Sequence, residues 1–321
     1  GLPLCAAAAM QMSRRRKRGN TCTTTNAATM LLSRRNLMLG GGATTLAAGG
    51  YALLNPSKLL PVLDFVDRML PGDVPTTQRA ANVSYGADPR QTLDVYAPAT
   101  RSGALPVVLF FYGGSWSSGR RQDYGFAGRA FASRGFVTVV PDYRLVPQVH
   151  FPGFVQDGAA ALEWVRANIG GLGGDASRIG VSGHSAGAYN AAMLALDPQF
   201  GVATDVRAFV GLAGPYDFYP FTTPSAQAAF GNAPEPALTQ PVSFAHAGAP
   251  PSLLLSGTAD TTVRPRNSKR LAAALEQAGS PVTQKLYPDV GHSGIVMALA
   301  RPFRNIASVL DDAGGFFTTH L

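Results

Sequence analysis

Short apolar runs alternate with segments of helical periodicity along most of this chain, and this alternation restricts the fold more than any other feature. The runs are rich in β-branched and aromatic residues, which is typical of buried strands. They are Leu93–Tyr96, Leu105–Tyr112, Phe136–Val140, Arg178–Ser182, Ala208–Leu212, Ser252–Ser256 and Gln284–Tyr287. The helical segments are Phe126–Ser133, Phe154–Ile169, Ala186–Leu196, Ser268–Ala278 and Gly294–Leu310. Such alternation requires right-handed β-α-β crossovers, so we predict an α/β fold with a mostly parallel sheet and helices on both faces.

One irregular stretch interrupts the alternation. Residues 214–251 are rich in Pro, Phe and Ala and lie between two predicted strands. A long connection of this kind is usually functional. We predict that it forms a small cap or a substrate-binding insertion.

A five-residue motif follows the predicted strand Arg178–Ser182. Gly183-His184-Ser185-Ala186-Gly187 has the form G-x-S-x-G and passes directly into a predicted helix. This strand-turn-helix context is the one that a nucleophilic serine needs, because small neighbours let the backbone turn tightly and raise the hydroxyl above the strand ends. Ser185 is therefore the candidate nucleophile.

The candidate acid and base lie further along the chain. A serine hydroxyl needs a base to remove its proton, and that base needs a carboxylate to orient it. In folds of this kind the acid and then the histidine follow the serine. Asp260 comes shortly after the predicted strand Ser252–Ser256, and His292 lies on a predicted loop after Gln284–Tyr287. Both positions are at the carboxyl ends of strands, where open α/β sheets place their sites.

Other residues compete for these two roles. Asp217 also follows a predicted strand and is the main alternative to Asp260, whereas Asp289 is close to His292 and is expected to cap a turn. His184 lies inside the motif and is expected to point away from the serine. A purely structural role for His292 is a further alternative. Three other histidines do not follow a strand end in the required order: His150, His246 and His320.

An acyl-transfer site also needs hydrogen-bond donors for the oxyanion. The predicted strand Leu105–Tyr112 runs into paired glycines, which let backbone amides approach a substrate without a Cβ in the way. We expect the amides of Gly113, Gly114 and Ala186 to be these donors. A plain glycine turn is the alternative.

At these residues the chain resembles the α/β-hydrolase superfamily, and within it the carboxylesterases related to hormone-sensitive lipase and to isoprenylcysteine methylesterases. The resemblance covers about residues 83–312, and its motifs agree in order and spacing. They are Tyr85-Gly86, Gln91, Leu93–Tyr96, Pro98, Tyr112–Trp116, Pro141–Leu145, Gly173–Asp175, Arg178-Ile179, Gly183–Gly187, Asp260 and His292.

The resemblance implies an α/β-hydrolase fold and a serine carboxylic-ester hydrolase that works through an acyl-enzyme. The aromatic residues of 216–221 suggest an apolar wall and hence a short-to-medium acyl or aromatic ester, although the same run would also suit core packing. Two alternatives remain open: a formamide or amide hydrolase of the same fold, and a non-catalytic binding protein.

Two details qualify the resemblance. Many relatives begin the oxyanion motif with a histidine where this chain has Tyr112, so no role of that histidine is transferred. Asp142-Tyr143-Arg144 looks structural in the family, and we expect an Asp/Arg pair in a tight loop.

The charge distribution argues against a nucleic-acid partner. The formal net charge is +8, but residues 1–63 contain eight basic side chains and no acidic one, which leaves 19 of each in residues 64–321. Phosphate binding needs a basic face that this neutral body does not provide. Both cysteines, Cys5 and Cys22, precede the body, which therefore has no disulfide, zinc-thiolate site or catalytic cysteine. We expect a small-molecule ester as partner and neither a cofactor nor a metal.

The N-terminal residues 1–54 are predicted to be a twin-arginine export signal. A basic segment, Ser13–Arg18, and the pair Arg34-Arg35 precede an apolar run, Leu37–Leu54, that contains five glycines. Such a signal would send the protein to the periplasm or out of the cell, or anchor it in a membrane if it is not cleaved. A disordered basic tail is the alternative. Met30 would give a compact signal start, and residues 1–29 would then be an extension.

The remaining residues divide into two parts. Residues 55–82 are predicted to be a linker with an amphipathic segment, Leu59–Leu70, that packs on the body or, as the alternative, lies on a membrane face. Residues 83–321 are predicted to form the α/β-hydrolase catalytic domain. The sequence does not define an oligomeric state.

Overall fold

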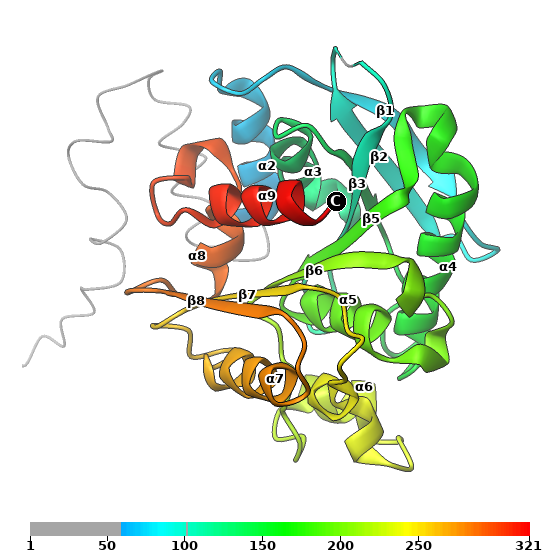
Figure 1. The fold of residues 1–321 in the computed structure, drawn as a ribbon, viewed down its shortest axis with the longest axis vertical. Coiled ribbons are helices and arrows are strands. Elements are labelled where there is room, and N and C mark those ends of the chain that lie inside the picture. Colours follow the sequence, from blue (N-terminus) through cyan, green and yellow to red (C-terminus); the bar gives the residue numbers. More distant parts are fainter. Residues whose placement is uncertain (1–58, 101) are drawn as a thin grey trace, which may run out of the picture. The chain divides into compact units, whose positions relative to one another are not determined.

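A central sheet of eight strands organises the computed structural model, which describes residues 59–100 and 102–321 (Figure 1). The predicted export signal and both cysteines lie outside the described residues. The strands are ordered β1-β2-β4-β3-β5-β6-β7-β8 across the sheet. Their bounds are β1 Thr76–Ser84, β2 Thr92–Pro98, β3 Leu105–Phe111, β4 Val137–Pro141, β5 Gly174–His184, β6 Val206–Leu212, β7 Ser252–Gly257 and β8 Val282–Tyr287. The strands from β4 to β8 are parallel, whereas β1 and β2 form an antiparallel edge.

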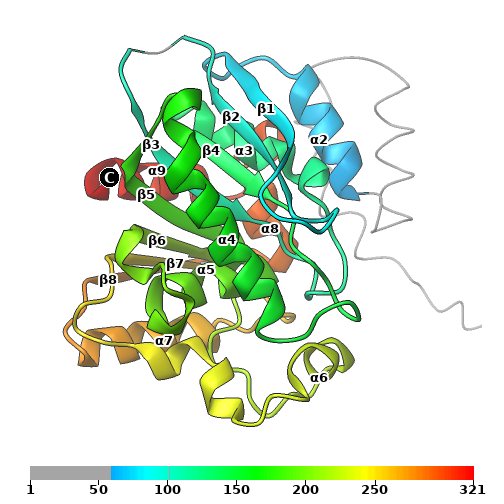
Figure 2. The same ribbon diagram turned by 90° about the vertical axis from the view of Figure 1, so that its right-hand side faces the viewer.

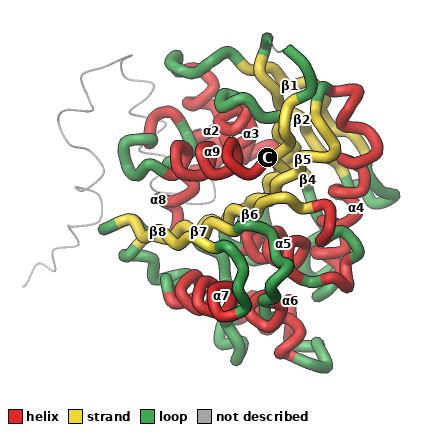
Figure 3. Tube along the Cα trace, in the orientation of Figure 1, coloured by secondary structure: helices red, strands yellow, loops and turns green. Residues whose placement is uncertain are grey.

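Helices cover both faces of this sheet, which confirms the predicted fold class (Figures 1 and 2). On one face α3 and α9 contact each other and the strands, and α2 packs outside α3. On the other face lie α4, α5 and α7. The bounds are α2 Leu59–Met69, α3 Gly125–Ala132, α4 Gly153–Asn168, α5 Ala186–Leu196, α6 Pro224–Phe230, α7 Arg266–Gln277, α8 His292–Met297 and α9 Val309–His320. Figure 3 shows the same two helical layers on either side of the strands.

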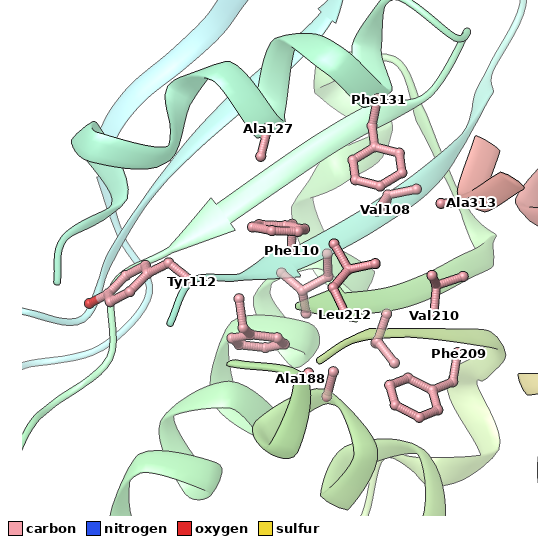
Figure 4. Packing of buried hydrophobic residues seen from close by; sticks show 14 of the residues in the cluster. Val108, Phe110, Tyr112, Ala127, Phe131, Ala188, Phe209, Val210, Leu212 and Ala313 are labelled. Atoms are coloured by element: carbon pink, nitrogen blue, oxygen red, sulfur yellow. The ribbon is translucent and has the colours of Figure 1, made fainter. Parts of the chain in front are cut away.

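The core follows from the two-residue alternation of the central strands. Val108 and Phe110 of β3 point towards α3, where the ring of Phe110 lies 6.0 Å from that of Phe131 (Figure 4). Phe111 points to the opposite face, against α4 at Gly158. Because β3 is apolar on both faces, it is held in the middle of the sheet, and the motif residues after it emerge at the carboxyl edge.

One predicted helix is wrong, and one strand is missing from the prediction. The segment predicted as one helix over Gly294–Leu310 is α8, a short 3₁₀ turn at Arg301–Phe303 and the start of α9. Pro302 explains the break, because proline cannot donate a backbone hydrogen bond and restricts the residue before it. In residues 55–82, α2 coincides with the predicted amphipathic segment and packs on α3 of the body, whereas the strand β1, most of which lies in this stretch, was not predicted. The β1 strand lacks a hydrophobic alternation and is held by backbone pairing with β2.

The insertion 214–251 lies between β6 and β7, as predicted from its position. It contains α6 and two 3₁₀ turns, Pro236–Thr239 and Pro241–Phe244. Gln240 is buried and its side-chain oxygen accepts the backbone N–H groups of Phe218 and Tyr219. These two hydrogen bonds join the first part of the insertion to its second part.

A buried arginine holds the edge of the sheet to the loop before α3. The guanidinium of Arg121 donates to Asp94 of β2 at 3.0 Å and to Asp142, and the backbone N–H of Arg121 donates to the same Asp142 at 2.8 Å. Arg144 does not pair with Asp142 but with Asp157 of α4, at 2.6 Å. The Asp/Arg pair expected within Asp142-Tyr143-Arg144 is therefore not formed. Instead, Asp142 pairs with Arg121 of the segment before α3, and Arg144 pairs with Asp157 of α4.

Replacing Arg121 by alanine should be strongly destabilising. The change leaves the carboxylates of Asp94 and Asp142 buried without their partner, which costs about 3–5 kcal/mol of unfolding free energy. Urea unfolding of the wild type and the Arg121→Ala variant measures the difference. The exposed neighbour Arg120, which pairs with Asp123, is the control, and Arg120→Ala should cost less than about 1 kcal/mol. Equal losses in the two variants would contradict the interpretation.

Candidate active site

Ser185 occupies a strained turn between β5 and α5. Its backbone φ of 54° lies in the left-handed region, which a residue with a Cβ adopts only under constraint. A Cβ on Gly183 would lie 2.4 Å from the carbonyl carbon of Gly187, and a Cβ on Gly187 would lie 2.1 Å from the carbonyl oxygen of Phe111. Both glycines of the motif are therefore required by space, and the tight turn places the serine at the carboxyl edge of the sheet.

The structure brings Ser185, His292 and Asp260 into one hydrogen-bonded chain. His292 Nε2 lies 2.9 Å from Ser185 Oγ, and His292 Nδ1 lies 2.8 Å from Asp260 Oδ2. Because a carboxylate only accepts, Nδ1 carries the proton and Nε2 is free to accept the serine proton. The other carboxylate oxygen of Asp260 accepts the backbone N–H groups of Thr262 and Val263, both at 2.9 Å. Asp260 is thus fixed and fully buried on its loop.

The two loops that carry Asp260 and His292 are joined to each other. The backbone N–H of Ala259 donates to the carbonyl oxygen of Val290 at 3.1 Å, and that of Thr258 donates to Tyr287 at 2.9 Å. A Cβ on Gly257, at the end of β7, would lie 1.9 Å from the Val290 oxygen. The close approach of these loops therefore sets the distance between carboxylate and imidazole.

His292 itself lies elsewhere in the secondary structure than predicted. It is the first residue of α8 rather than part of a loop. Gly291 precedes it in an extended conformation, so the chain changes direction immediately before the imidazole. The prediction failed because the segment after Gly291 was assigned to one long helix beginning at Gly294.

The alternative acid and bases have other partners. The Asp217 carboxylate pairs with Arg270 of α7 at 2.7 Å, near the surface. Asp289 adopts a left-handed conformation with φ of 59°, as expected for a turn residue. The side chains of His150 and His246 contact, respectively, the carbonyl of Ala228 and the backbone N–H of Gly248, while His320 packs on Phe316 of α9.

His184 has a role that the sequence did not reveal. It does not contact the serine hydroxyl, but its Nε2 lies 3.2 Å from the backbone oxygen of His292, and the two rings are 4.8 Å apart. A carbonyl only accepts, so Nε2 is protonated; Nδ1 is buried without a hydrogen-bond partner among the described residues. Burial is the main cause that lowers the pKa of His184 well below its usual range, and the nearby His292 ring lowers it further. His184 is therefore a neutral support for the backbone and ring of His292.

The backbone amides near Ser185 differ in availability. Burial raises the pKa of the Tyr124 hydroxyl, and the backbone amide of Gly113, which lies near that hydroxyl, opposes the rise. No hydrogen bond of the described residues engages the amides of Gly114, Ser115 or Ala186. A Cβ on Gly113 would be crowded, because it would lie 3.0 Å from the backbone oxygen of His184 and 3.1 Å from the Ser185 Cβ. The sequence had placed Gly113 among the donors and had not considered Ser115.

Tyr112 takes a structural place at the start of this loop. Its ring is fully buried and stacks on Tyr143 at 4.7 Å and on Tyr124 at 5.6 Å. Its hydroxyl accepts from Arg90 at 2.8 Å, and its carbonyl accepts from the Tyr143 hydroxyl at 2.8 Å. These contacts hold the loop rigidly against the body.

The chain matches a known family over most of this body. The family model BD-FAE matches residues 93–275, which include Ser185 and Asp260. The chain belongs to the BD-FAE family. Two curated relatives are the esterase LipC of Mycobacterium tuberculosis, 32% identical over 65% of this chain and 58% of that protein, and the isoprenylcysteine alpha-carbonyl methylesterase ICME of Arabidopsis thaliana, 27% identical over 75% of this chain and 64% of that protein. The chain thus spans about three fifths of the length of these relatives.

Solved structures agree with the fold of this BD-FAE family member. An inhibited esterase B from Lactobacillus rhamnosis matches with a TM-score of 0.69 and 23% identity, over 86% of this chain and 96% of that chain. A truncated carbohydrate esterase from gut microbiota matches with a TM-score of 0.68 and 22% identity, over 78% of this chain and 98% of that chain. At these identities the matches establish the α/β-hydrolase fold.

Neither a metal cluster nor a membrane-spanning helix is found in the described part of this BD-FAE family chain. Residues 59–100 and 102–321 contain no group of three or more His, Cys, Asp or Glu side chains arranged to hold a metal ion. Within the same residues no helix combines the length and the apolar character needed to cross a bilayer.

Acidification should destabilise the protein through His184. The folded state keeps this histidine neutral, whereas the unfolded chain binds a proton below a pH of about 6.5. Stability is therefore retained above that pH and falls by about 1.4 kcal/mol for each unit below it, until the lowered folded pKa is reached. The measurement is the loss of unfolding free energy between neutral pH and about one pH unit below 6.5. This loss should be about 1.4 kcal/mol smaller in His184→Phe than in the wild type. Replacement of the exposed His320 by alanine is the control, and an unchanged difference in His184→Phe would contradict the assignment.

Proposed function

We propose that this chain is a serine carboxylesterase that works through an acyl-enzyme. The observation that carries the proposal is the chain of hydrogen bonds from Asp260 through His292 to Ser185, at 2.8 and 2.9 Å. Further support comes from the strained turn at Ser185, which is the geometry of a nucleophile elbow. The relatives LipC and ICME are named as an esterase and a methylesterase.

The proposed reaction has two halves. Ser185 Oγ attacks the ester carbonyl while its proton passes to His292 Nε2, and Asp260 stabilises the resulting imidazolium. The tetrahedral intermediate then breaks its bond to the alcohol oxygen, which receives the proton from His292. Water then gives a proton to His292 Nε2 and attacks the acyl carbon, and when the bond to Ser185 Oγ breaks, His292 returns that proton to Oγ, so the carboxylic acid leaves and the free serine is restored.

Backbone amides are proposed to donate hydrogen bonds to the oxyanion of both tetrahedral intermediates. We assign Gly114 and Ala186 as donors, as expected from the sequence, and add Ser115 because its amide has no other partner among the described residues. Ala186 is the first residue of α5, so its N–H belongs to the unpaired first turn and lies at the positive end of the helix dipole. Gly113 is assigned a steric role.

The proposed substrate is an ester with a short-to-medium acyl chain or an aromatic acid. Trp116, next to the amide loop, packs on Tyr189 of α5 and on two rings of the insertion, Phe218 and Phe230, at 4.7 to 6.0 Å. Trp116, Tyr189 and Phe230 are buried and form the packed base of this cluster, whereas Phe218 is half-buried and is the ring that we assign to the expected apolar wall. Tyr216 belongs to the buried core instead, so only part of the aromatic run 216–221 contributes.

Turnover of p-nitrophenyl butyrate by variants of the three residues tests the proposal. Ser185→Ala should lower kcat by about 10⁴-fold or more, and Asp260→Asn by about 10⁴-fold, because the asparagine favours the wrong tautomer of His292. Asp217→Asn is the matched control and should remain within about twofold of the wild type. A wild-type protein without turnover would support a non-catalytic hydrolase fold, and unchanged turnover in Ser185→Ala would overturn the serine mechanism.

A substrate panel tests the acyl wall and the bond that is cleaved. We expect kcat/KM for p-nitrophenyl esters to fall by at least about tenfold, or about 1.4 kcal/mol, from butyrate to palmitate. Phe218→Ala should shift the preference to longer chains, whereas substitution of the exposed Tyr219 by alanine should not. Faster cleavage of matched formamides or anilides than of esters would favour the amide hydrolase instead.

A further inference from the structure

Helix α2 buries Leu63 together with its two acidic residues, and it exposes two of its large apolar residues. Its acidic residues Asp64 and Asp67 are buried, with 5% and 1% of their surface exposed. Its largest apolar residues, Phe65 and Met69, are 65% and 69% exposed. A soluble helix normally buries its apolar side, so the outward side of α2 is suited to a partner.

Ion pairs fix this orientation. Arg129 of α3 donates to Asp64 at 2.9 Å and to Asp67 at 2.7 Å, and all three side chains are buried. The backbone N–H of Arg301 also donates to Asp67, at 2.8 Å. Turning the helix over would leave these buried charges unpaired, which is costly. Phe65 and Met69 are therefore held outwards by the structure (Figure 2 shows α2 outside α3).

Two half-buried valines join the two exposed residues in a stripe along the helix. Val62, Phe65, Val66 and Met69 are spaced at three and four residues and so share one side of the helix. We call these four residues the α2 stripe. Val74, just beyond the helix, is also exposed, at 56%.

We propose that the α2 stripe docks on the surface of a lipid bilayer. The chain that leads into the helix supports this occupant. The apolar run Leu37–Leu54, predicted above as an export or anchor segment, ends five positions before Leu59. Five extended residue steps span about 18 Å at most. A bilayer that holds the apolar run therefore lies within reach of the α2 stripe.

Charge complementarity favours an anionic lipid surface. Lys58 is the one charged residue between the apolar run and the helix, and it comes directly before Leu59. Arg68 flanks the stripe, is mostly exposed, and pairs with Asp64 at 2.9 Å. Basic residues beside an apolar helix side are typical of interfacial helices, which insert about 5–10 Å into the headgroup region. The acids of α2, which such a surface would repel, are turned towards the body.

Site-specific fluorescence tests the proposal on the full chain. With Cys5→Ser and Cys22→Ser as background, the environment-sensitive probe NBD is attached to Phe65→Cys or to Met69→Cys. Leu238→Cys is the matched control, because Leu238 is another exposed apolar residue and lies in the insertion. With vesicles of phosphatidylcholine and phosphatidylglycerol, the probes on α2 should shift their emission to the blue and be quenched by nitroxide-labelled lipid. The probe at Leu238 should do neither.

Each other outcome contradicts lipid docking. Probes on α2 that stay in water when vesicles are added show that no lipid contacts the stripe. A blue shift without vesicles shows that another part of the chain covers it, and a shift that depends on protein concentration without lipid shows a second copy. In a further variant, Phe65→Ser with Met69→Ser, a probe on Val74→Cys should lose its lipid-dependent shift, and a retained shift would also contradict the proposal.

Discussion

The close contact between α5 and the end of β3 is the constraint on which the site depends. Gly187 of α5 lies so close to the end of β3 that a Cβ on it would be 2.1 Å from the carbonyl oxygen of Phe111 and 2.5 Å from that of Tyr112. The helix can approach the strand this closely because Gly187 has no Cβ. This approach brings Ser185 and the first amide of α5 beside the loop that begins at Gly113. The proposed nucleophile and oxyanion donors thus follow two different strands but are positioned by one packing contact.

Paired buried charges hold the surrounding loops at fixed distances. Arg121 joins β2 to the loop after β4, and Arg144 joins that same loop to α4. Arg129 attaches α2 to the body in a similar way. Because a buried ion is costly without its partner, each pair selects one arrangement of its loops. The rigid surroundings allow a site built mostly from loops to keep hydrogen-bond distances.

The fold and the three residues that meet at the site could be predicted from the sequence, because local sequence signals indicate each of them. Hydrophobic periodicity marks strands, and G-x-S-x-G before a helix marks an elbow. The prediction missed what depends on distant contacts. The β1 strand has no apolar pattern of its own, and the contact of His184 with His292 joins residues 108 positions apart. Spacing also does not indicate that the amide of Gly113 lies near the Tyr124 hydroxyl.

The central claim is that Ser185 is the residue that becomes acylated. The most direct measurement is intact and peptide mass spectrometry after reaction with diethyl p-nitrophenyl phosphate, which phosphorylates an activated serine irreversibly. The account predicts one adduct per chain, located on the peptide that contains Ser185, and no adduct in Ser185→Ala. An adduct on another residue, or equal labelling of the variant, would contradict it.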